Sequence, residues 1–279
     1  MTEITGYELE AIFKQVPLLA KFRPDDFEIE TLTGFTNLNL HLKNDQHDWV
    51  LRIPKQETNQ YINRQHETYN SDLASKLGIA PECVWSAGSG LSLTMTLLNS
   101  RSINRQDLKN DSVFKSLLKT ISQLHKSKIK FKGRVDLTEL ITRYYHLAPR
   151  QNRIQIEPGY KKALKKITIL SNRKMPLVPS HNDLVLENIL IDVNGQIWII
   201  DWEYSSMASP YWDLATLCNA ANLNQARSIQ VLDEYQQESD DMEIEILFEY
   251  RFVLNLLSIC WMAAFTGIDP GPEIEKLNS

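Results

Sequence analysis

The chain has 279 residues, of which 43% are hydrophobic and 23% charged, and its formal net charge is −5. This length and composition are typical of a globular protein with one large domain or two lobes, and they allow a substantial core. The negative net charge argues against nucleic acid as a partner, because binding of a phosphate backbone needs clustered positive charge.

The first third of the chain has a pattern rich in strands. Residues 5–20 are amphipathic and predict a helix. Residues 61–77 predict a second helix, with Tyr69, Leu73 and Leu77 on its apolar face. The predicted strands share alternation of apolar and polar residues: 27–33, 38–44, 48–54, 83–87 and 92–97. We expect a five-stranded antiparallel sheet with one helix packed in a small lobe.

Beyond about residue 100 the pattern is mainly helical. Apolar residues recur at helical spacing in six segments: 111–127, 136–148, 158–172, 211–222, 225–238 and 242–266. A hairpin at 189–200 interrupts them, with Asn194–Gly195 as its expected two-residue turn. A strand-rich first third and a helical remainder predict an α+β fold. We place the N-terminal lobe at 1–97 and the helical C-terminal lobe at 98–279, with a ligand cleft between them.

The sequence also predicts where the protein resides. The N-terminus lacks the basic and apolar regions of a signal peptide, and the three cysteines are scattered, as in proteins with reduced thiols. The most apolar stretch, residues 252–265, contains Asn255 and is too short to span a bilayer. We therefore expect a buried helix there, no membrane insertion and a cytoplasmic protein.

Polar residues stand at the ends of the predicted hairpin, in SHNDLVLENILIDVNGQIWIIDWEYSS (180–206). A hairpin brings its two ends together, so Asn188 and Asp201 are expected side by side, and their oxygens suit Mg²⁺. Asp183 precedes them in the loop and is free to orient a hydroxyl or to accept its proton. His181 belongs to the same catalytic loop, where we expect it to brace the backbone.

This stretch resembles the catalytic loop and metal-binding segment of the kinase-like phosphotransferases. Within that superfamily, HNDLVLENIL and IDWEYSSMASPYWDLA resemble the bacterial choline kinases. The segments TGFTNLN (33–39) and NRQHETYN (63–70) are similar to the nucleotide loop and the start of helix C in those enzymes. The resemblance extends over roughly residues 30–265. It implies a protein-kinase-like fold, with ATP and Mg²⁺ as cofactors.

The resemblance also implies a role for each matching residue. Asp183 matches the catalytic base, and Asn188 and Asp201 match the Mg²⁺ ligands. Arg52 matches the basic residue that holds the nucleotide phosphates, although the familiar kinase residue is lysine. Glu67 matches the acid of helix C that pairs with that basic residue.

Further matches concern the nucleotide and the loop. The loop at 34–37 contains a single glycine, so Thr36 and Asn37 are expected to contact phosphates through side chains and backbone N–H groups. Thr96 and Leu98 fall at the hinge between the lobes, where backbone groups bind adenine. Asp213 matches an aspartate that braces the catalytic loop from the following helix.

A quaternary ammonium group cannot donate a hydrogen bond, so aromatic faces and negative charge must hold it. The candidates lie in the C-terminal half of the chain: Trp202, Glu203, Tyr204, Trp212 and Trp261. Trp261 has the best case, because the resembled enzymes place an aromatic cage residue on the C-terminal helix. Those enzymes often have two tryptophans there, whereas this chain offers Trp261 alone. Either the cage is completed differently or the substrate is not choline.

The first hypothesis is therefore an ATP-dependent choline kinase that acts on a small cationic alcohol as a monomer or homodimer. Thiamine kinase is the first alternative, because thiamine is also a cation with a primary alcohol. Ethanolamine and aminoglycosides follow, and the acidic stretch 233–249 keeps an aminoglycoside open. A module that binds nucleotide without turnover is disfavoured, since Asp183, Asn188 and Asp201 are all present.

Overall fold

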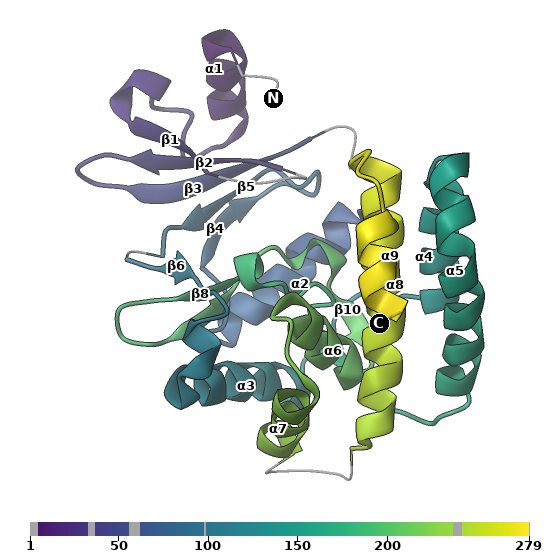
Figure 1. Cartoon of the computed structure of the whole chain (residues 1–279). Helices are drawn as coiled ribbons and strands as arrows, with labels where there is room; N and C mark the ends of the chain where they lie inside the picture. The colour runs from purple at the N-terminus through teal and green to yellow at the C-terminus, as the bar shows by residue number, and fades with distance from the viewer. Residues whose placement is uncertain (1–4, 33–36, 56–61, 98, 237–241, 279) are drawn as a thin grey trace. The chain divides into compact units, whose positions relative to one another are not determined.

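The computed structural model describes residues 5–32, 37–55, 62–97, 99–236 and 242–278 (Figure 1). The chain divides into two compact units. Unit 1 contains residues 1–101 and 190–205, and unit 2 contains 102–189 and 206–279. The segment 190–205, which contains most of the hairpin, thus belongs to unit 1 although residues 102–189 belong to unit 2. The lobe boundary between residues 97 and 98 stays a prediction.

Unit 1 contains the predicted five-stranded antiparallel sheet, with strand order β1-β2-β3-β5-β4. Its strands are β1 (Glu28–Leu32), β2 (Asn37–Lys43), β3 (Asp48–Pro54), β4 (Cys83–Ser86) and β5 (Ser92–Met95). In the β2–β3 register Leu40 lies opposite Leu51 and Asn39 lies opposite Arg52. Because side chains alternate between faces, Arg52 lies on the face opposite to these leucines.

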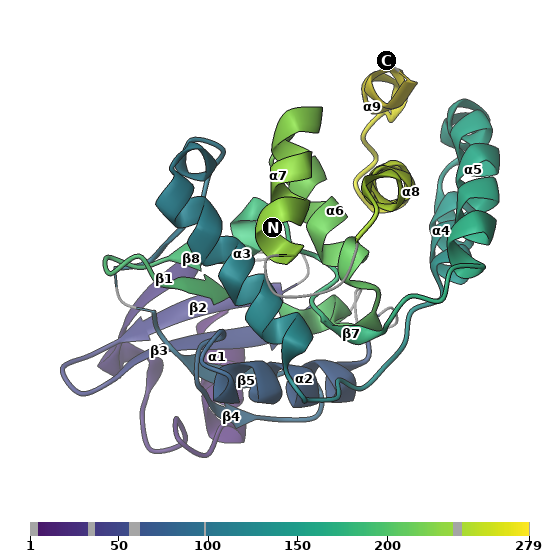
Figure 2. The same cartoon turned by 90° about the horizontal axis from the view of Figure 1, so that it is seen from below.

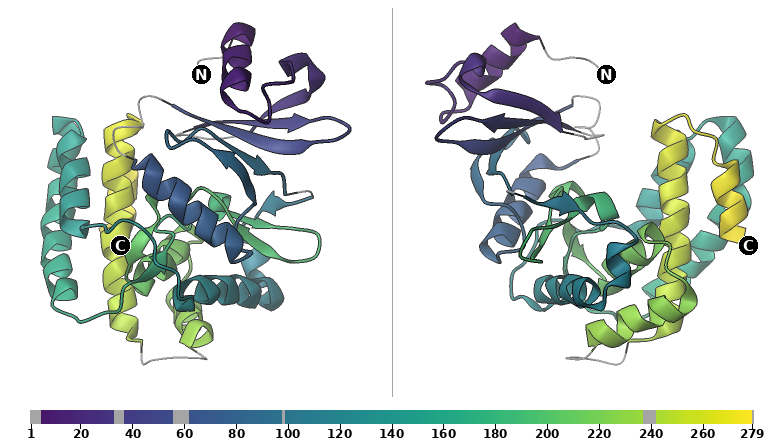
Figure 3. Two further views of the ribbon diagram at one scale, coloured as in Figure 1. Left: turned by 180° about the vertical axis from the view of Figure 1, so that it is seen from behind. Right: turned by 60° about the vertical axis from the view of Figure 1, so that its left-hand side comes forward.

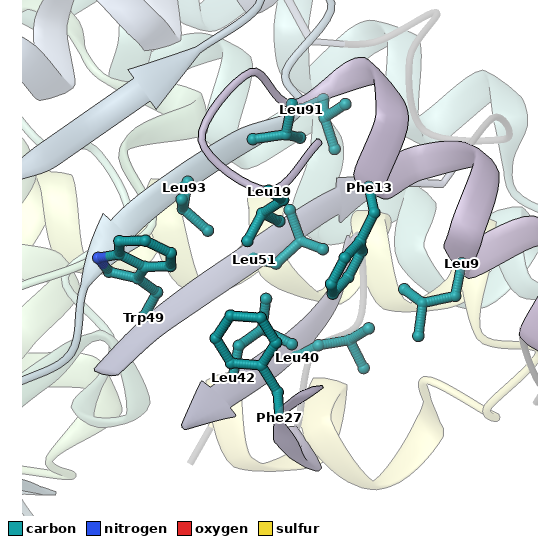
Figure 4. Packing of buried hydrophobic residues seen from close by; sticks show 11 residues of the cluster. Leu9, Phe13, Leu19, Phe27, Leu40, Leu42, Trp49, Leu51, Leu91 and Leu93 are labelled. Atoms are coloured by element: carbon teal, nitrogen blue, oxygen red, sulfur yellow. The ribbon is translucent and has the colours of Figure 1, made fainter. Parts of the chain in front are cut away.

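The leucine face of the sheet is covered by α1 (Gly6–Gln15) (Figure 4). Thr5 and Glu8 form a capping box that fixes where α1 begins. Phe13 of this helix is 1% exposed, and its ring meets that of Phe27 edge to face at 6.0 Å. The buried cluster also includes residues of the sheet and the flanking loops: Leu9, Val16, Leu19, Leu40, Leu42, Trp49, Leu51, Leu91 and Leu93. The core of unit 1 therefore leaves the Arg52 face free for polar chemistry.

The helix α2 (Arg64–Lys76) buries a polar face, which corrects the sequence prediction. Tyr69, expected on the apolar face, is 40% exposed, and Leu73 and Leu77 are half-buried. The buried positions of the helix are Arg64, Glu67, Asn70 and Ala74. Asn70 donates to the backbone oxygen and to the hydroxyl of Ser205, at 3.0 and 3.1 Å. The helix is thus placed by buried hydrogen bonds and charges more than by an apolar stripe.

The predicted hairpin is present as β8 (Ile189–Ile191) and β9 (Ile197–Ile199), but its turn is longer than two residues. The backbone N–H of Asp192 donates to Gln196 O at 3.1 Å, and Gly195 has a φ of +79°. The Asp192 carboxylate accepts from the N–H groups of Asn194 and Gln196. A type I′ turn needs positive φ at both central residues, whereas among the described residues here only Gly195 of the pair has it.

Unit 2 is mainly helical, as predicted. Its helices are α3 (Asp111–Lys126), α4 (Leu137–Leu147), α5 (Arg150–Ser171), α6 (Pro210–Ala220), α7 (Gln225–Gln236), α8 (Ile244–Phe265) and α9 (Gly271–Asn278). Figures 2 and 3 show α8 beside α5 and α9, and α8 also packs on α4 and α6. Gly159 allows the close approach, because a Cβ there would lie 3.1 Å from Leu256.

Three features of unit 2 differ from the prediction. Helix α5 begins at Arg150 and contains Pro158, at which it was expected to begin. The short antiparallel pair β7 (Val178–Ser180) and β10 (Ser206–Ala208), together with α9, was not predicted. Short strands carry too few residues for a period-2 pattern, and β7 and β10 are three residues each. The pair holds the start of the 181–188 loop beside the entry to α6.

The apolar helix expected at the C-terminus is α8. By length and composition this helix could cross a membrane, and half of its most apolar window is buried inside the protein. Its buried residues include Val253, Leu256 and Ile259, which pack with Ile141 of α4 and Ile156 of α5. These contacts are those of a core helix in a folded unit.

The packing of α1 on the sheet leads to the first prediction. Phe13→Ala is expected to lower the free energy of unfolding by about 3–5 kcal/mol, because it removes a buried ring and leaves a cavity. Tyr7→Ala on the same helix, at an 84% exposed position, should change it by less than about 0.5 kcal/mol. Urea unfolding of the two variants measures both effects. Equal losses would mean that α1 contributes no core packing.

Candidate active site

The loop that follows β7 is fixed by one buried carboxylate. Asp213, near the start of α6, is 0% exposed and accepts hydrogen bonds from the backbone N–H groups of His181 at 2.8 Å and of Asn182 at 2.7 Å. Trp212 next to it donates its indole N–H to Asn182 O at 3.0 Å. The brace expected from Asp213 is therefore confirmed, and Trp212 supports the same turn of the loop.

Behind Asp213 lies a buried pair of hydrogen-bonded side chains. His125 of α3 contacts Asp213 Oδ2 through Nε2 at 2.9 Å and the hydroxyl of Tyr235 through Nδ1 at 2.9 Å. Burial raises the pKa of the Asp213 carboxyl. The hydrogen bond and charge of His125 and the hydrogen bond from His181 lower it by more, so the pKa lies below its ordinary value. The ionised carboxylate therefore stabilises the folded state at neutral pH, and this contribution is lost as the pH falls through the lowered pKa.

Within the loop, Asn188 holds Asp183. The side-chain nitrogen of Asn188 donates to Asp183 O and to its carboxylate Oδ2, both at 3.0 Å. Asn188 is 9% exposed, whereas Asp183 is half-buried. The amide nitrogen is turned to Asp183, so the amide oxygen is the atom that can bind a cation. Asn182, between the brace and Asp183, has a φ of +66° and donates to the hydroxyl of Ser206 at 2.8 Å.

Unit 1 carries a second charged centre, around Arg52 of β3. Arg52 NH2 donates to Asp201 Oδ1 at 2.7 Å and to Glu203 Oε2 at 3.0 Å, and NH1 lies 2.6 Å from Glu67 Oε1. Burial lowers the pKa of Arg52, and its three carboxylate neighbours raise it by more, so the guanidinium stays charged. The predicted pairing of Glu67 with Arg52 is present.

Two further side chains complete this centre. Arg64 of α2 donates through NH1 to Glu67 Oε2 at 2.8 Å and lies 3.5 Å from Glu203 Oε2. Asn37 donates to the same Glu203 oxygen at 3.1 Å. Burial and the charge of Asp201 raise the pKa of Glu203 to about 7, against the opposing effect of Arg52. Burial therefore makes the charge of Glu203 costly to keep.

The carboxylates of Glu67, Asp201 and Glu203 offer oxygens within 4.8 Å of one another, as in a metal site. Arg52 lies among all three of them, so the group forms a salt-bridge network in this state. Asp201 is the most exposed of the three, with 33% of its side chain accessible. Its φ of +65° is an uncommon backbone conformation that occurs at functional sites.

The aromatic candidates differ in accessibility. Trp202 is 2% exposed and donates to Ile199 O, and Trp212 is 5% exposed and supports the loop. Tyr204 is half-buried. Trp261 of α8 is also half-buried, and its ring lies 5.8 Å from that of Phe265. The substrate role predicted for Trp202, Trp212 and Glu203 stays a prediction. In the structure these side chains contact Ile199, Asn182 and Arg52.

Two predicted nucleotide contacts, Thr36 and Leu98, lie outside the described residues. Thr96 is half-buried, and its backbone N–H donates to Asp48 O at 3.2 Å. Sequence reasoning missed Arg64, although it stands three residues before Glu67 on α2. Such a spacing indicates a salt bridge on a helix surface. Only the burial of this helix face shows that Arg64 belongs to the site.

Fold and site together define a class of protein. A five-stranded antiparallel sheet with α2, a helical unit, and a loop with Asp183 and Asn188 followed by a hairpin and Asp201 are the parts of a kinase-like phosphotransferase. A family model described as choline/ethanolamine kinase matches residues 29–254. The chain belongs to the choline/ethanolamine kinase family and is a phosphotransferase with an alcohol as acceptor.

Individual relatives support this assignment. The chain is 28% identical over 248 residues to Protein LicA of Haemophilus influenzae, covering 83% of this chain and 71% of that one. Among solved structures, choline kinase LicA from Streptococcus pneumoniae matches with a TM-score of 0.82 at 22% identity, over 97% of both chains. A structure of LicA in complex with AMP matches with a TM-score of 0.77 at 22% identity, over 90% of both chains. These two structural likenesses confirm the protein-kinase-like fold.

The brace on the loop leads to the second prediction. Asp213→Asn is expected to cost about 1–3 kcal/mol of stability, because its amide hydrogens must face the N–H groups of His181 or Asn182 or the ring of His125. Hydrogen exchange at the amides of His181 and Asn182 should accelerate. Asp136→Asn, at the N-cap of α4, is the control, since asparagine caps as well as aspartate does. Unchanged exchange at the two loop amides would contradict the role given to Asp213.

Proposed function

We propose that the protein transfers the γ-phosphoryl group of ATP to the hydroxyl of choline and so produces phosphocholine. The observation that carries the proposal is the geometry of the 181–188 loop. In this loop Asp183 is held by Asn188, and the backbone before it is hydrogen-bonded to Asp213. Membership of the choline/ethanolamine kinase family supports the class of acceptor.

In this proposal Asp183 orients the acceptor hydroxyl and accepts its proton. The hydroxyl oxygen attacks the γ-phosphorus, the bond from that phosphorus to the β-phosphate oxygen breaks, and ADP leaves. Phosphoryl transfer needs alignment and charge neutralisation more than covalent help from the protein. Asp183 fits this role because it is half-buried and its carboxylate is oriented by the side-chain amide of Asn188.

Asn188 and Asp201 are the proposed Mg²⁺ ligands. Both fit the ion chemically, because an amide oxygen and a carboxylate are hard oxygen donors. Bound Mg²⁺ supplies positive charge that offsets the negative charge on the phosphate oxygens. Asp201 contacts Arg52 through Oδ1, and exchange of this contact for the ion would make Arg52 available to the phosphates. Asn37 and Thr96 stay the other proposed nucleotide contacts in the described part of the chain.

Tyr204 and Trp261 are the most accessible of the aromatic candidates for the choline cage. Each residue is half-buried, whereas Trp202 and Trp212 are 2% and 5% exposed. Phe265, one turn after Trp261 on α8, lies with its ring 5.8 Å away and can supply a second aromatic face where only one tryptophan was expected. A cation–π contact is worth about 0.5–2 kcal/mol, so two or three such faces are enough for selectivity. Ethanolamine is the second candidate, because the matched family model is described as choline/ethanolamine kinase.

The cellular setting belongs to the proposal as well. ATP and free Mg²⁺ are available inside the cell, and the buried or half-buried cysteines have no disulfide in the described chain. We therefore propose a cytoplasmic enzyme. Thiamine and aminoglycosides remain acceptors to be tested against choline.

The third prediction is the acceptor itself. ADP release is measured with ATP·Mg²⁺ and choline, ethanolamine, thiamine or an aminoglycoside, and choline is expected to give the highest kcat/KM. Asp183→Ala should lower kcat by at least ~10²-fold, because the hydroxyl loses its base. Glu187→Gln, an exposed change in the same loop, is the matched control. A higher kcat/KM for another acceptor, or an unaffected Asp183→Ala, would overturn the substrate or the catalytic role.

The fourth prediction concerns Trp261. Trp261→Ala should raise the KM for choline by about 2–30-fold, because one cation–π contact is lost, and it should change the KM for ATP little. Phe252→Ala controls for lost packing, since Phe252 is on the same helix and packs on the same cluster. Phe252→Ala is expected to change the KM for choline and the KM for ATP to the same extent. If Trp261→Ala does the same, Trp261 is a packing residue only.

A further inference from the structure

We infer that Arg64 is a positioning residue for nucleotide binding: it keeps Glu67 and Glu203 neutralised so that Arg52 can leave them and bind phosphates. The inference deepens the proposed function and rests on its assignment of Arg52 to the phosphates. It concerns unit 1 alone, and it follows from how two guanidinium groups share three carboxylates.

The contacts divide the carboxylates between the two arginines. Glu67 uses both oxygens, with Oε1 on Arg52 NH1 at 2.6 Å and Oε2 on Arg64 NH1 at 2.8 Å. Glu203 Oε2 lies 3.0 Å from Arg52 and 3.5 Å from Arg64. Asp201 Oδ1 lies 2.7 Å from Arg52 NH2. Arg64 therefore contacts two of the three acids that Arg52 contacts, Glu67 and Glu203.

Burial gives this division its importance. The side chains of Arg64 and Glu67 are each 6% exposed, and that of Glu203 is 2% exposed. Three carboxylates and two guanidiniums have a formal sum of −1. A buried carboxylate that loses its partner costs several kcal/mol, so Arg52 could hardly leave if it were the sole counterion. With Arg64 in place, Glu67 keeps one strong bond, and Glu203 keeps Arg64 together with the amide of Asn37.

The position of Arg64 is set by the turn between β4 and β5. Gly90 in this turn has a φ of +92°, and a Cβ added there would lie 2.7 Å from Arg64 Cδ and 3.0 Å from its Nε. The stem of Arg64 thus passes over the glycine in a space that any side chain would fill. This packing holds the Arg64 guanidinium at Glu67 and Glu203. In our inference Arg52 is therefore the arginine that changes its contacts when phosphates bind.

The test measures ATP binding and turnover separately. Arg64→Gln should raise the dissociation constant of ATP·Mg²⁺, measured by calorimetry, by about tenfold or more, because Arg52 becomes the only counterion of the acids. The KM for choline should change less than about twofold. Arg64→Lys, which keeps a charge without the planar fork, should recover part of the loss. A dissociation constant within twofold of the original in Arg64→Gln would overturn the inference.

Two further variants keep the test valid if Arg64→Gln folds poorly. Gly90→Ala should displace the Arg64 stem and weaken ATP binding, whereas Gly88→Ala in the same turn, whose Cβ would lie 4.0 Å from Gln65, should not. Adding Glu203→Gln to Arg64→Gln removes one acid together with its counterion and should recover ATP affinity. If neither Gly90→Ala nor the double variant behaves in this way, Arg64 has only a structural role.

The calorimetric readout also separates this inference from the proposed function. A wild-type protein that binds ATP·Mg²⁺ without phosphorylating choline would contradict the proposed acceptor and leave the Arg64 test readable. A wild-type protein that phosphorylates choline while Arg64→Gln binds ATP normally would contradict the inference alone.

Discussion

Buried carboxylates that must be neutralised or fully hydrogen-bonded are the constraint on which both units depend. In unit 2, Asp213 receives two backbone N–H groups and His125, and the loop that carries Asp183 takes its shape from these bonds. In unit 1, Glu67 and Glu203 are satisfied by arginines, and α2 takes its place from that pairing. In each case the cost of an unpaired buried charge, several kcal/mol, exceeds the gain from most single apolar contacts.

The two centres use this constraint differently. Asp213 accepts two backbone N–H groups of the loop and contacts His125, so it fixes the loop. Arg52 is shared among three acids, and one of these, Asp201, is the most exposed and has the backbone conformation that occurs at functional sites. A saturated carboxylate gives rigidity, which a base such as Asp183 needs. A shared guanidinium gives an exchangeable partner, which a phosphate-binding residue needs before its ligand arrives.

The sequence predicted the sheet and most helices, because alternation and helical spacing are local signals, and the resemblance to the kinase-like phosphotransferases implied the brace of Asp213. It failed where burial decides. The face of α2 was assigned to Tyr69, Leu73 and Leu77 on hydrophobicity, whereas the structure buries Arg64, Glu67 and Asn70. The local sequence pattern is the same for a charged helix face exposed to solvent and for one buried against Arg52 and Glu203, as in α2. The turn at Asn194–Gly195 failed similarly, because Asp192 captures two of its N–H groups.

The presence of arginine at position 52, where kinases usually have lysine, follows from the same constraint. The two terminal nitrogens of Arg52 contact different acids: NH1 binds Glu67, and NH2 binds Asp201 and Glu203. A lysine ammonium group is a compact charge and lacks the planar, rigidly arranged N–H donors of a guanidinium group. Lysine could balance one of these acids well but not all three at bonding distance. The additional acid at Glu203 therefore favours arginine at position 52, and Arg64 contributes a second cation beside it.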